Sequence, residues 1–186
     1  MSLTLSSMLP LGTLAPHFDL PDTITGKSLS LQALKSPTAT VIMFICNHCP
    51  FVKHVLPQIL KIAHEYGEKG ISFVAISAND PIAYPEDAPQ QMTEMAKAYC
   101  FPFPYLFDET QEIAKAYQAV CTPDFFVFDG ALRCVYRGQL DDSSPSKDIV
   151  HLTGLSLRNA LNCLISGNPI NSDQKPSMGC NIKWKA

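Results

Sequence analysis

The stretch TVIMFICNHCPFVKHVLPQI, residues 40–59, decides the fold of this chain. Its first six residues are apolar or β-branched, which is typical of a strand that is buried on both faces. From Phe51 onward, apolar residues recur at helical spacing, so a helix is expected there. The tetrad CNHC joins the two elements. We therefore expect two thiols, those of Cys46 and Cys49, where a buried strand passes into a helix.

A thiol at the start of a helix has an unusual electrostatic environment. The first backbone N–H groups of a helix have no partner within it, and the positive end of the helix dipole lies there. Both features stabilise a thiolate, the form of cysteine that attacks disulfides, peroxides or metals. The sequence thus predicts chemistry at Cys46. The alternative is that Cys46 and Cys49 are structural thiols that happen to lie three residues apart.

Strands and helices alternate along the rest of the chain, as in an α/β sandwich with a partly parallel sheet. A small N-terminal hairpin is expected from residues 18–20 and 27–31. Further strands are expected at 71–77, 103–107, 125–128 and 132–138, and helices at 90–99, 111–118 and 155–165. The remainder, from Asn168 onward, contains Pro, Ser and Gly and is expected to be a tail.

Length and composition limit what the molecule can be. The 186 residues are expected to form one domain, with a core at about 12–167 and a tail at 168–186. A net charge of −3 argues against nucleic acid as a partner, and no apolar run is long enough for a membrane span. Seven cysteines without a regular framework fit a reducing compartment, and no signal peptide is evident. We therefore expect a cytoplasmic protein.

The order of elements around the CxxC tetrad resembles the thioredoxin fold, a three-layer α/β/α sandwich with a mixed central sheet. The N-terminal section is most similar to the peroxiredoxin-like branch, that of alkyl hydroperoxide reductase and thiol-specific antioxidant. Residues 15–27 resemble the opening motif of that branch, and YLFDETQEIAKAY at 105–117 with TPDFFVFD at 122–129 resembles its central region. The resemblance extends from about Gly12 to Gly167 and implies an oxidoreductase without a tightly bound cofactor.

The resemblance also implies a substrate platform. Thr122 and Pro123 match a cis-proline that faces the CxxC pair in this family, and the Thr122 backbone would bind an extended substrate by strand addition. Asn47 is expected to contact substrate with Thr122. The alternative is a trans proline that merely opens the strand at Phe125.

Roles for the pair follow from the same resemblance. Cys46 is expected to be exposed and to attack a partner disulfide, and the deeper Cys49 then resolves the mixed disulfide. Asn47 and His48 replace the Gly and Pro of thioredoxin. A protonated His48 would favour the thiolate and make the couple more oxidising. The alternative for His48 is a solvated residue without effect.

Two further cysteines are candidate auxiliary thiols. Cys121 precedes the expected cis-proline, so it should lie near the pair. Cys180 lies in SMGCNIKWKA at 177–186, which resembles a C-terminal motif of one peroxiredoxin-like subgroup. This tail could fold back and deliver Cys180 to Cys46 as a resolving thiol. Alternatively, Ile182 and Trp184 simply pin the terminus to the core.

The sequence favours a thiol-disulfide oxidoreductase that acts on protein or small-molecule disulfides or peroxides with an unidentified thiol electron donor. A thiol peroxidase with the same nucleophile is the main rival, although Met43 and Ala39 stand where typical peroxiredoxins have Thr or Ser and Pro. A third hypothesis is a carrier of a thiophilic metal. Its ligands would be Cys46, His48 and Cys49, with Cys180 or Cys121.

Overall fold

The computed structural model describes residues 3–145 and 151–185, so Ala186 of the expected tail lies outside the described residues. The strands are β1 (Leu3–Leu5), β2 (Asp19–Pro21), β3 (Ser28–Ser30), β4 (Ala39–Phe44), β5 (Ile71–Ser77), β6 (Tyr105–Phe107), β7 (Cys121–Thr122), β8 (Asp124–Asp129), β9 (Cys134–Gly138) and β10 (Met178–Asn181). The helices are α1 (Leu31–Leu34), α2 (Pro50–Gly67), α3 (Pro89–Ala98), α4 (Glu112–Ala116) and α5 (Leu155–Ile165), with a 3-10 turn η1 (Pro85–Asp87).

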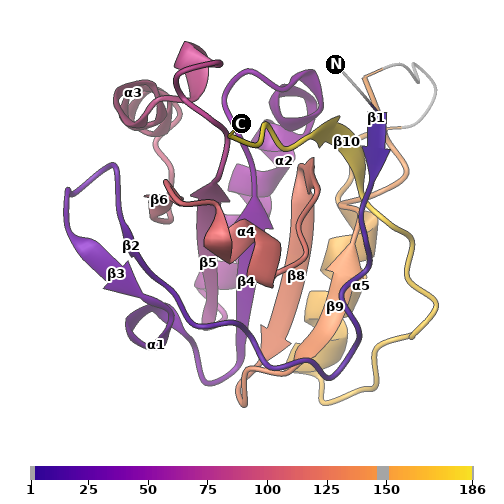
Figure 1. Cartoon of the computed structure of the whole chain (residues 1–186). Coiled ribbons are helices and arrows are strands. Elements are labelled where there is room, and N and C mark those ends of the chain that lie inside the picture. Colours follow the sequence, from indigo (N-terminus) through magenta and orange to yellow (C-terminus); the bar gives the residue numbers. More distant parts are fainter. Residues whose placement is uncertain (1–2, 146–150, 186) are drawn as a thin grey trace.

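The central sheet has the strand order β6-β5-β4-β8-β9 and is mixed (Figure 1). β4, β5 and β6 run parallel, whereas β8 and β9 are antiparallel to their neighbours. All six residues of β4 are buried, because helices or loops cover both faces of this strand. The predicted central strand and the predicted mixed sheet are therefore confirmed. The predicted N-terminal hairpin is also present, as β2 paired with β3.

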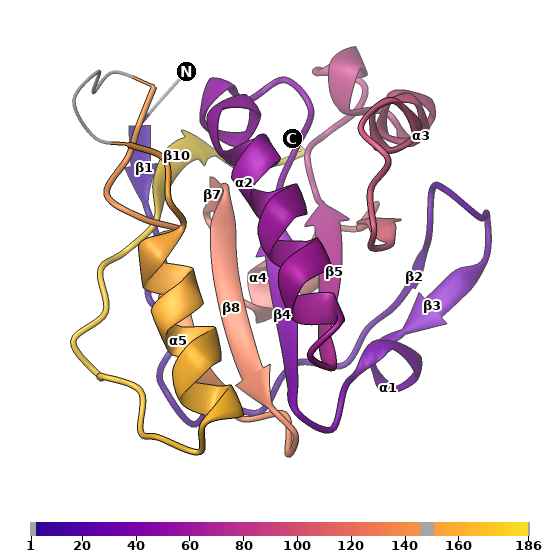
Figure 2. The same ribbon diagram turned by 180° about the vertical axis from the view of Figure 1, so that it is seen from behind.

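Two apolar clusters flank this sheet. α2 and α5 cover one face, which Figure 2 shows in front. Side chains of α2 that recur at helical spacing, among them Val55, Ile59 and Ile62, are buried there. The other face is covered by the N-terminal segment, α1 and α4, which bury Leu31 and Ala114 among other residues. The CNHC tetrad lies at the end of the central sheet where β4 passes into α2, between the two clusters.

The C-terminal segment is not an irregular tail as expected. Its residues Met178–Asn181 form β10, the middle strand of a second sheet with the order β1-β10-β7. Cys180 lies opposite Leu3 on one side and opposite Thr122 on the other. In Figure 1 this segment crosses the end of the central sheet above β8 and β4. Sequence periodicity did not reveal β10, because four residues are too few to show an alternating pattern.

A buried carboxyl lies where the two sheets meet. Asp124 is the first residue of β8 and is fully buried. The hydroxyl of Ser6 donates to its Oδ2 at 2.9 Å, and the backbone N–H of Phe125 donates to its Oδ1 at 3.1 Å. Burial raises the pKa of Asp124 to about 7, although hydrogen bonds from Ser177 and Ser6 oppose this rise. Ser6, which follows β1, and Ser177, which precedes β10, are thus hydrogen-bonded to a carboxyl whose pKa lies near neutral pH.

This raised pKa makes stability depend on pH. Since the folded state binds the Asp124 proton more tightly than the unfolded chain, the contribution is complete below about pH 4 and is lost as pH rises through about 7. We expect Asp124→Asn to remove this loss, which should be on the order of 4 kcal/mol. Urea unfolding at several pH values measures it, with Asp173→Asn at an exposed site as the control. Parallel pH profiles for wild type and Asp124→Asn would contradict the prediction.

Candidate active site

The CNHC tetrad bridges β4 and α2, but only its second cysteine lies at the helix terminus. α2 begins at Pro50, with Cys49 as its N-cap residue. Cys46 lies three residues earlier, in the loop after β4. Cys49, and not Cys46, is therefore the residue next to the free N–H groups of the first helical turn, although its side chain makes no capping hydrogen bond. The sequence predicted that the helix terminus stabilises a thiolate at Cys46, but the residue at this terminus is Cys49.

Neither sulfur is exposed in this conformation. Cys46 is 1% exposed and Cys49 is 0% exposed, so the expectation of an exposed Cys46 is wrong. The cause is β7, which lies directly against the pair. The Thr122 hydroxyl is 3.2 Å from Cys46 Sγ, and the Thr122 carbonyl oxygen accepts from Cys49 Sγ at 3.3 Å. The Thr122–Pro123 bond is cis, as predicted.

Hydrogen-bond donors converge on Cys49. The hydrogen bond from the Cys46 thiol has the largest effect and lowers the pKa of Cys49 to about 5. The thiol and the backbone N–H of Cys180 and the backbone N–H of Val52 act in the same direction, against the effect of burial. By contrast, the pKa of Cys46 is raised well above its usual range, because Cys46 donates to Cys49, is buried and lies near the Asp87 carboxylate. The opposite directions of the two pKa shifts favour the negative charge on Cys49 over Cys46.

The two auxiliary thiols differ in their environments. Cys180 approaches Cys49 rather than Cys46, which was the partner expected from the sequence. Burial and its hydrogen bond to Cys49 raise the pKa of Cys180 to about 12. Cys121 is fully buried, its Sγ faces the carbonyl oxygen of Pro123 at 4.0 Å, and burial raises its pKa further still. Only Cys180 is in hydrogen-bond contact with the pair.

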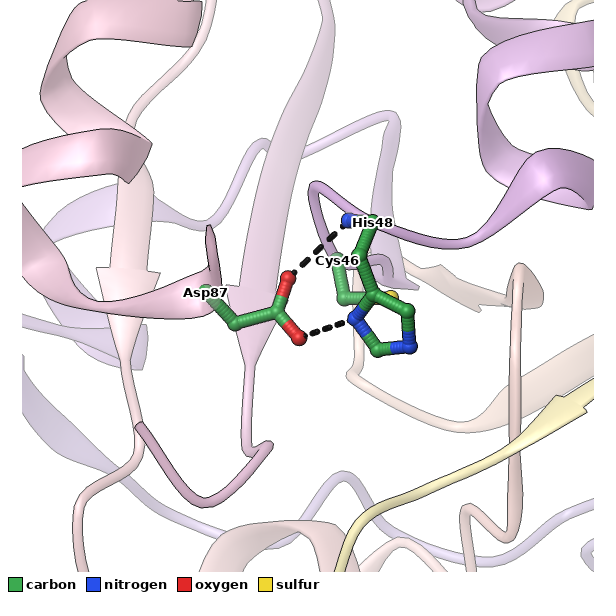
Figure 3. A group of neighbouring side chains, drawn as sticks. All are labelled: Cys46, His48 and Asp87. Atoms are coloured by element: carbon green, nitrogen blue, oxygen red, sulfur yellow. Dashed lines mark hydrogen bonds and ion pairs between the residues drawn. The ribbon is translucent and has the colours of Figure 1, made fainter. Parts of the chain in front are cut away.

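Asp87 is a site residue that sequence reasoning missed. It comes from η1 and is fully buried, and it holds the CNHC loop by hydrogen bonds to Asn47 and to His48, of which Figure 3 shows those to His48. Its Oδ1 accepts from the backbone N–H groups of Asn47 at 2.7 Å and His48 at 3.1 Å. Its Oδ2 accepts from His48 Nδ1 at 2.5 Å and from Asn79 at 2.8 Å. No spacing rule links Asp87 to a motif forty residues earlier, so the sequence held no signal for it.

The two residues between the cysteines point away from open solvent. The His48 ring stacks on Tyr84 with centroids 5.1 Å apart, and its Nε2 has no hydrogen-bond partner among the described residues. Because His48 pairs with Asp87, a proton on its ring is offset by a carboxylate. The Asn47 side chain accepts a hydrogen bond from the Tyr105 hydroxyl at 3.1 Å. Both side chains thus hold the loop in place.

One group of side chains in the described part of the chain has the donor atoms for a metal. Sulfur, nitrogen and oxygen atoms of Cys46, His48 and Asp87 lie within 4.8 Å of one another. These are donors that suit Zn²⁺. The set differs from the predicted one, because Asp87 takes the place of Cys49. Since Asp87 already accepts from His48 Nδ1, a metal would compete with an existing ion pair.

Titration of the reduced protein tests which sulfur is charged. We expect the ultraviolet absorbance of the thiolate to fall as pH is lowered through about 5, the pKa of Cys49. Cys49→Ser should lose this transition, and Cys46→Ala should move it to higher pH, by about one unit or more, because the main donor is gone. Cys100→Ser, at an exposed site, is the control. Loss of the transition in Cys46→Ala but not in Cys49→Ser would reverse the assignment.

Known proteins share this architecture. An uncharacterized conserved protein from Geobacillus kaustophilus is 56% identical, with a TM-score of 0.97 over 100% of this chain and 97% of that one. A putative thioredoxin from Neisseria meningitidis, at 23% identity and a TM-score of 0.62 over 86% of this chain and 91% of that one, shows that the fold is thioredoxin-like.

Sequence comparison gives the family. The thiol-disulfide oxidoreductase ResA of Halalkalibacterium halodurans is 31% identical over 75 residues, which are 40% of this chain. The match spans only 42% of the length of that curated relative. Residues 11–136 match the AhpC/TSA family, as the opening and central motifs predicted. The chain belongs to the AhpC/TSA family, on the thioredoxin-like fold.

Proposed function

We propose that this protein is a thiol-disulfide oxidoreductase in which Cys46 and Cys49 cycle between a dithiol and a disulfide. The observation that carries the proposal is that the two buried sulfurs both contact Thr122, beside a cis-proline and at the start of a helix. Two thiols that contact the same residue are placed to form a bridge, and the lowered pKa of Cys49 favours its reactive thiolate form. The likeness of part of the chain to a thiol-disulfide oxidoreductase supports this activity.

The exchange proceeds in two steps. Cys46 attacks a substrate disulfide, which gives a mixed disulfide and releases one substrate thiolate. Cys49 then attacks the Cys46 sulfur, so that the second substrate thiolate leaves and a Cys46–Cys49 bridge remains. In the described conformation Cys46 holds the proton of the pair. That proton must pass to Cys49 or to the leaving thiolate before Cys46 can react, and the existing hydrogen bond provides the path.

The surrounding residues would support these steps. Thr122 and Pro123 form the platform beside the pair, and the Thr122 hydroxyl lies against Cys46. His48 and Asp87 position the loop between the cysteines. The substrates would be protein or small-molecule disulfides, and a thiol electron donor would reduce the bridge again. The seven cysteines are odd in number and form no regular disulfide framework, which supports a reducing compartment such as the cytoplasm. Among the described residues, no helix is long and apolar enough to cross a membrane.

Peroxide reduction is a second candidate activity, which membership of the AhpC/TSA family favours. In that reaction Cys46 would attack the peroxide, forming a sulfenic acid that Cys49 resolves to the same bridge with loss of water. Met43 and Ala39, which occupy two positions of the peroxidase motif, are both buried strand residues without a hydroxyl. Brief exposure of Cys49→Ser to peroxide, followed by a sulfenic-acid probe, separates the two activities.

A glutathione redox titration tests the main proposal. The protein is equilibrated at defined ratios of reduced to oxidised glutathione, alkylated in denaturant and weighed by intact mass. We expect wild type to lose two alkylatable thiols in one transition, and peptide mapping to show a Cys46–Cys49 bridge. Cys46→Ser and Cys49→Ser should form no Cys46–Cys49 bridge and should turn over a disulfide substrate much more slowly than wild type, whereas Cys100→Ser should match wild type. A protein that forms no Cys46–Cys49 bridge at any ratio would not be this enzyme.

A further inference from the structure

β10 occupies the edge of β7 beside the cysteine pair. The two strands run antiparallel, with Cys180 opposite Thr122 and Asn181 opposite Cys121. This is the backbone edge at which an extended substrate would add a strand next to the cis-proline. The chain therefore fills its own substrate platform with a segment that carries a cysteine. The side chain at the position opposite Thr122 is the one that reaches the pair.

The close fit of β10 depends on the glycine before that cysteine. A Cβ at Gly179 would lie 2.0 Å from the carbonyl oxygen of Thr122 and 3.2 Å from the Pro123 ring. Any side chain there would push β10 off the platform. With glycine, the strand comes close enough for both the thiol and the backbone N–H of Cys180 to reach the Cys49 sulfur.

Contacts of the residues that follow β10, and pairing with β1, also hold β10 in this position. The N–H of Ile182 donates to the carbonyl oxygen of Val120 at 3.0 Å. The N–H of Lys183 donates to the Asn79 side chain at 2.8 Å, and its carbonyl oxygen accepts from the N–H of Asp80 at 2.9 Å. β1 pairs with the opposite edge of β10. Backbone hydrogen bonds on both edges of β10, to β1 and to β7, thus hold Cys180 next to Cys49.

We propose that Cys180 is a third redox thiol of this site, and that its disulfide partner is Cys49. The inference rests on the proposed function. After Cys46 and Cys49 have formed their bridge, the Cys180 sulfur attacks the Cys49 sulfur. A Cys49–Cys180 bond forms, the Cys46–Cys49 bond breaks, and the proton lost by Cys180 goes to the departing Cys46 thiolate. No further oxidant is consumed, since one disulfide replaces another and Cys46 is regenerated as a thiol.

Electrostatics change in favour of this step when the pair is oxidised. In the reduced site, burial, the hydrogen bond to Cys49 and the negative charge of Cys49 all raise the pKa of Cys180. Once Cys49 is part of a disulfide, it carries no charge and accepts no proton from Cys180, so two of these three causes disappear. Lys183, which lowers the pKa of Cys180, remains in place. The attacking thiolate therefore becomes accessible only after substrate has been reduced.

Removal of Cys46 isolates the proposed bond. Cys46→Ser is treated with oxidised glutathione, which forms a mixed disulfide with Cys49. We expect Cys180 to displace the glutathione, so that intact mass shows two lost thiols, no adduct, and a Cys49–Cys180 bridge on peptide mapping. In Cys46→Ser combined with Cys180→Ser the glutathione adduct should persist. Cys46→Ser combined with Cys121→Ser is the matched control and should still form the bridge, because Cys121 does not contact the pair.

A stable glutathione adduct in Cys46→Ser, with Cys180 still free to be alkylated, would overturn the inference. The proposed function has its own readout, since Cys180→Ser retains Cys46 and Cys49. If that variant forms the Cys46–Cys49 bridge and reduces a disulfide while Cys46→Ser forms no bridge, the third thiol fails and the oxidoreductase stands. If neither bridge forms in wild type, both fail.

A second variant tests the placement of β10 with every thiol but Cys46 intact. In the Cys46→Ser background, Gly179→Ala should slow displacement of the glutathione, because the new Cβ meets the Thr122 carbonyl oxygen. Gly67→Ala is its matched control, since a Cβ there has open space. Equal rates in the two variants would contradict a role for the β7–β10 pairing. Should Gly179→Ala fail to fold, the cysteine variants still decide the proposal.

Discussion

The chemistry of this site depends on the hydrogen bonds that converge on the Cys49 sulfur. Cys49 is the N-cap residue of α2, so its side chain lies where the first helical N–H groups are free. Cys46 and Cys180 add thiol donors from two other parts of the chain. A buried thiolate is costly unless it is hydrogen-bonded, and here several donors offset that cost. The negative charge favoured on Cys49 therefore lies in the protein interior and is not exposed to solvent.

Because the negative charge is favoured on Cys49, the resting state of the site differs from the state that reacts with a substrate. Cys46 has the position of the attacking cysteine but holds the proton and lies under Thr122, close to the Asp87 carboxylate. Asp87 also holds the loop between the cysteines through its backbone N–H groups. A single buried carboxylate thus shapes the loop and disfavours a second negative charge beside it. Any event that withdraws donors from Cys49 shifts the shared proton toward it and frees Cys46 to react.

The C-terminal strand connects these electrostatic effects to substrate binding. β10 supplies two of the donors to Cys49 and at the same time covers the edge of β7 next to the cis-proline. An extended substrate that takes the place of β10 would therefore also remove the Cys180 donors from Cys49. In the proposed mechanism, occupation of the platform and ionisation of the pair would be coupled through this strand. Residues 11–136 are the part of the chain that matches the AhpC/TSA family. β10 lies outside this part, so the coupling would come from a segment that the family match does not include.

The sequence by itself determined the fold and the location of the site. An apolar strand, the CNHC tetrad and a helix with a regular apolar face are local patterns, and they predicted β4, the cysteine pair and α2 correctly. The motif around Thr122 and Pro123 likewise predicted the cis-proline. These features depend on neighbours in sequence or on a motif of the family, so they could be recognised without coordinates.

Tertiary structure alone decided which groups lie next to each sulfur and in which direction they shift its pKa. Asp87 reaches the pair from forty residues away, and Cys180 from more than a hundred, so neither contact has a sequence spacing that could reveal it. The sequence placed both thiols at the helix N-terminus, and only the structure shows that Cys49 rather than Cys46 is the N-cap residue. Proton affinity in a buried site depends on donors and charges within a few ångströms, and only the folded chain brings those together.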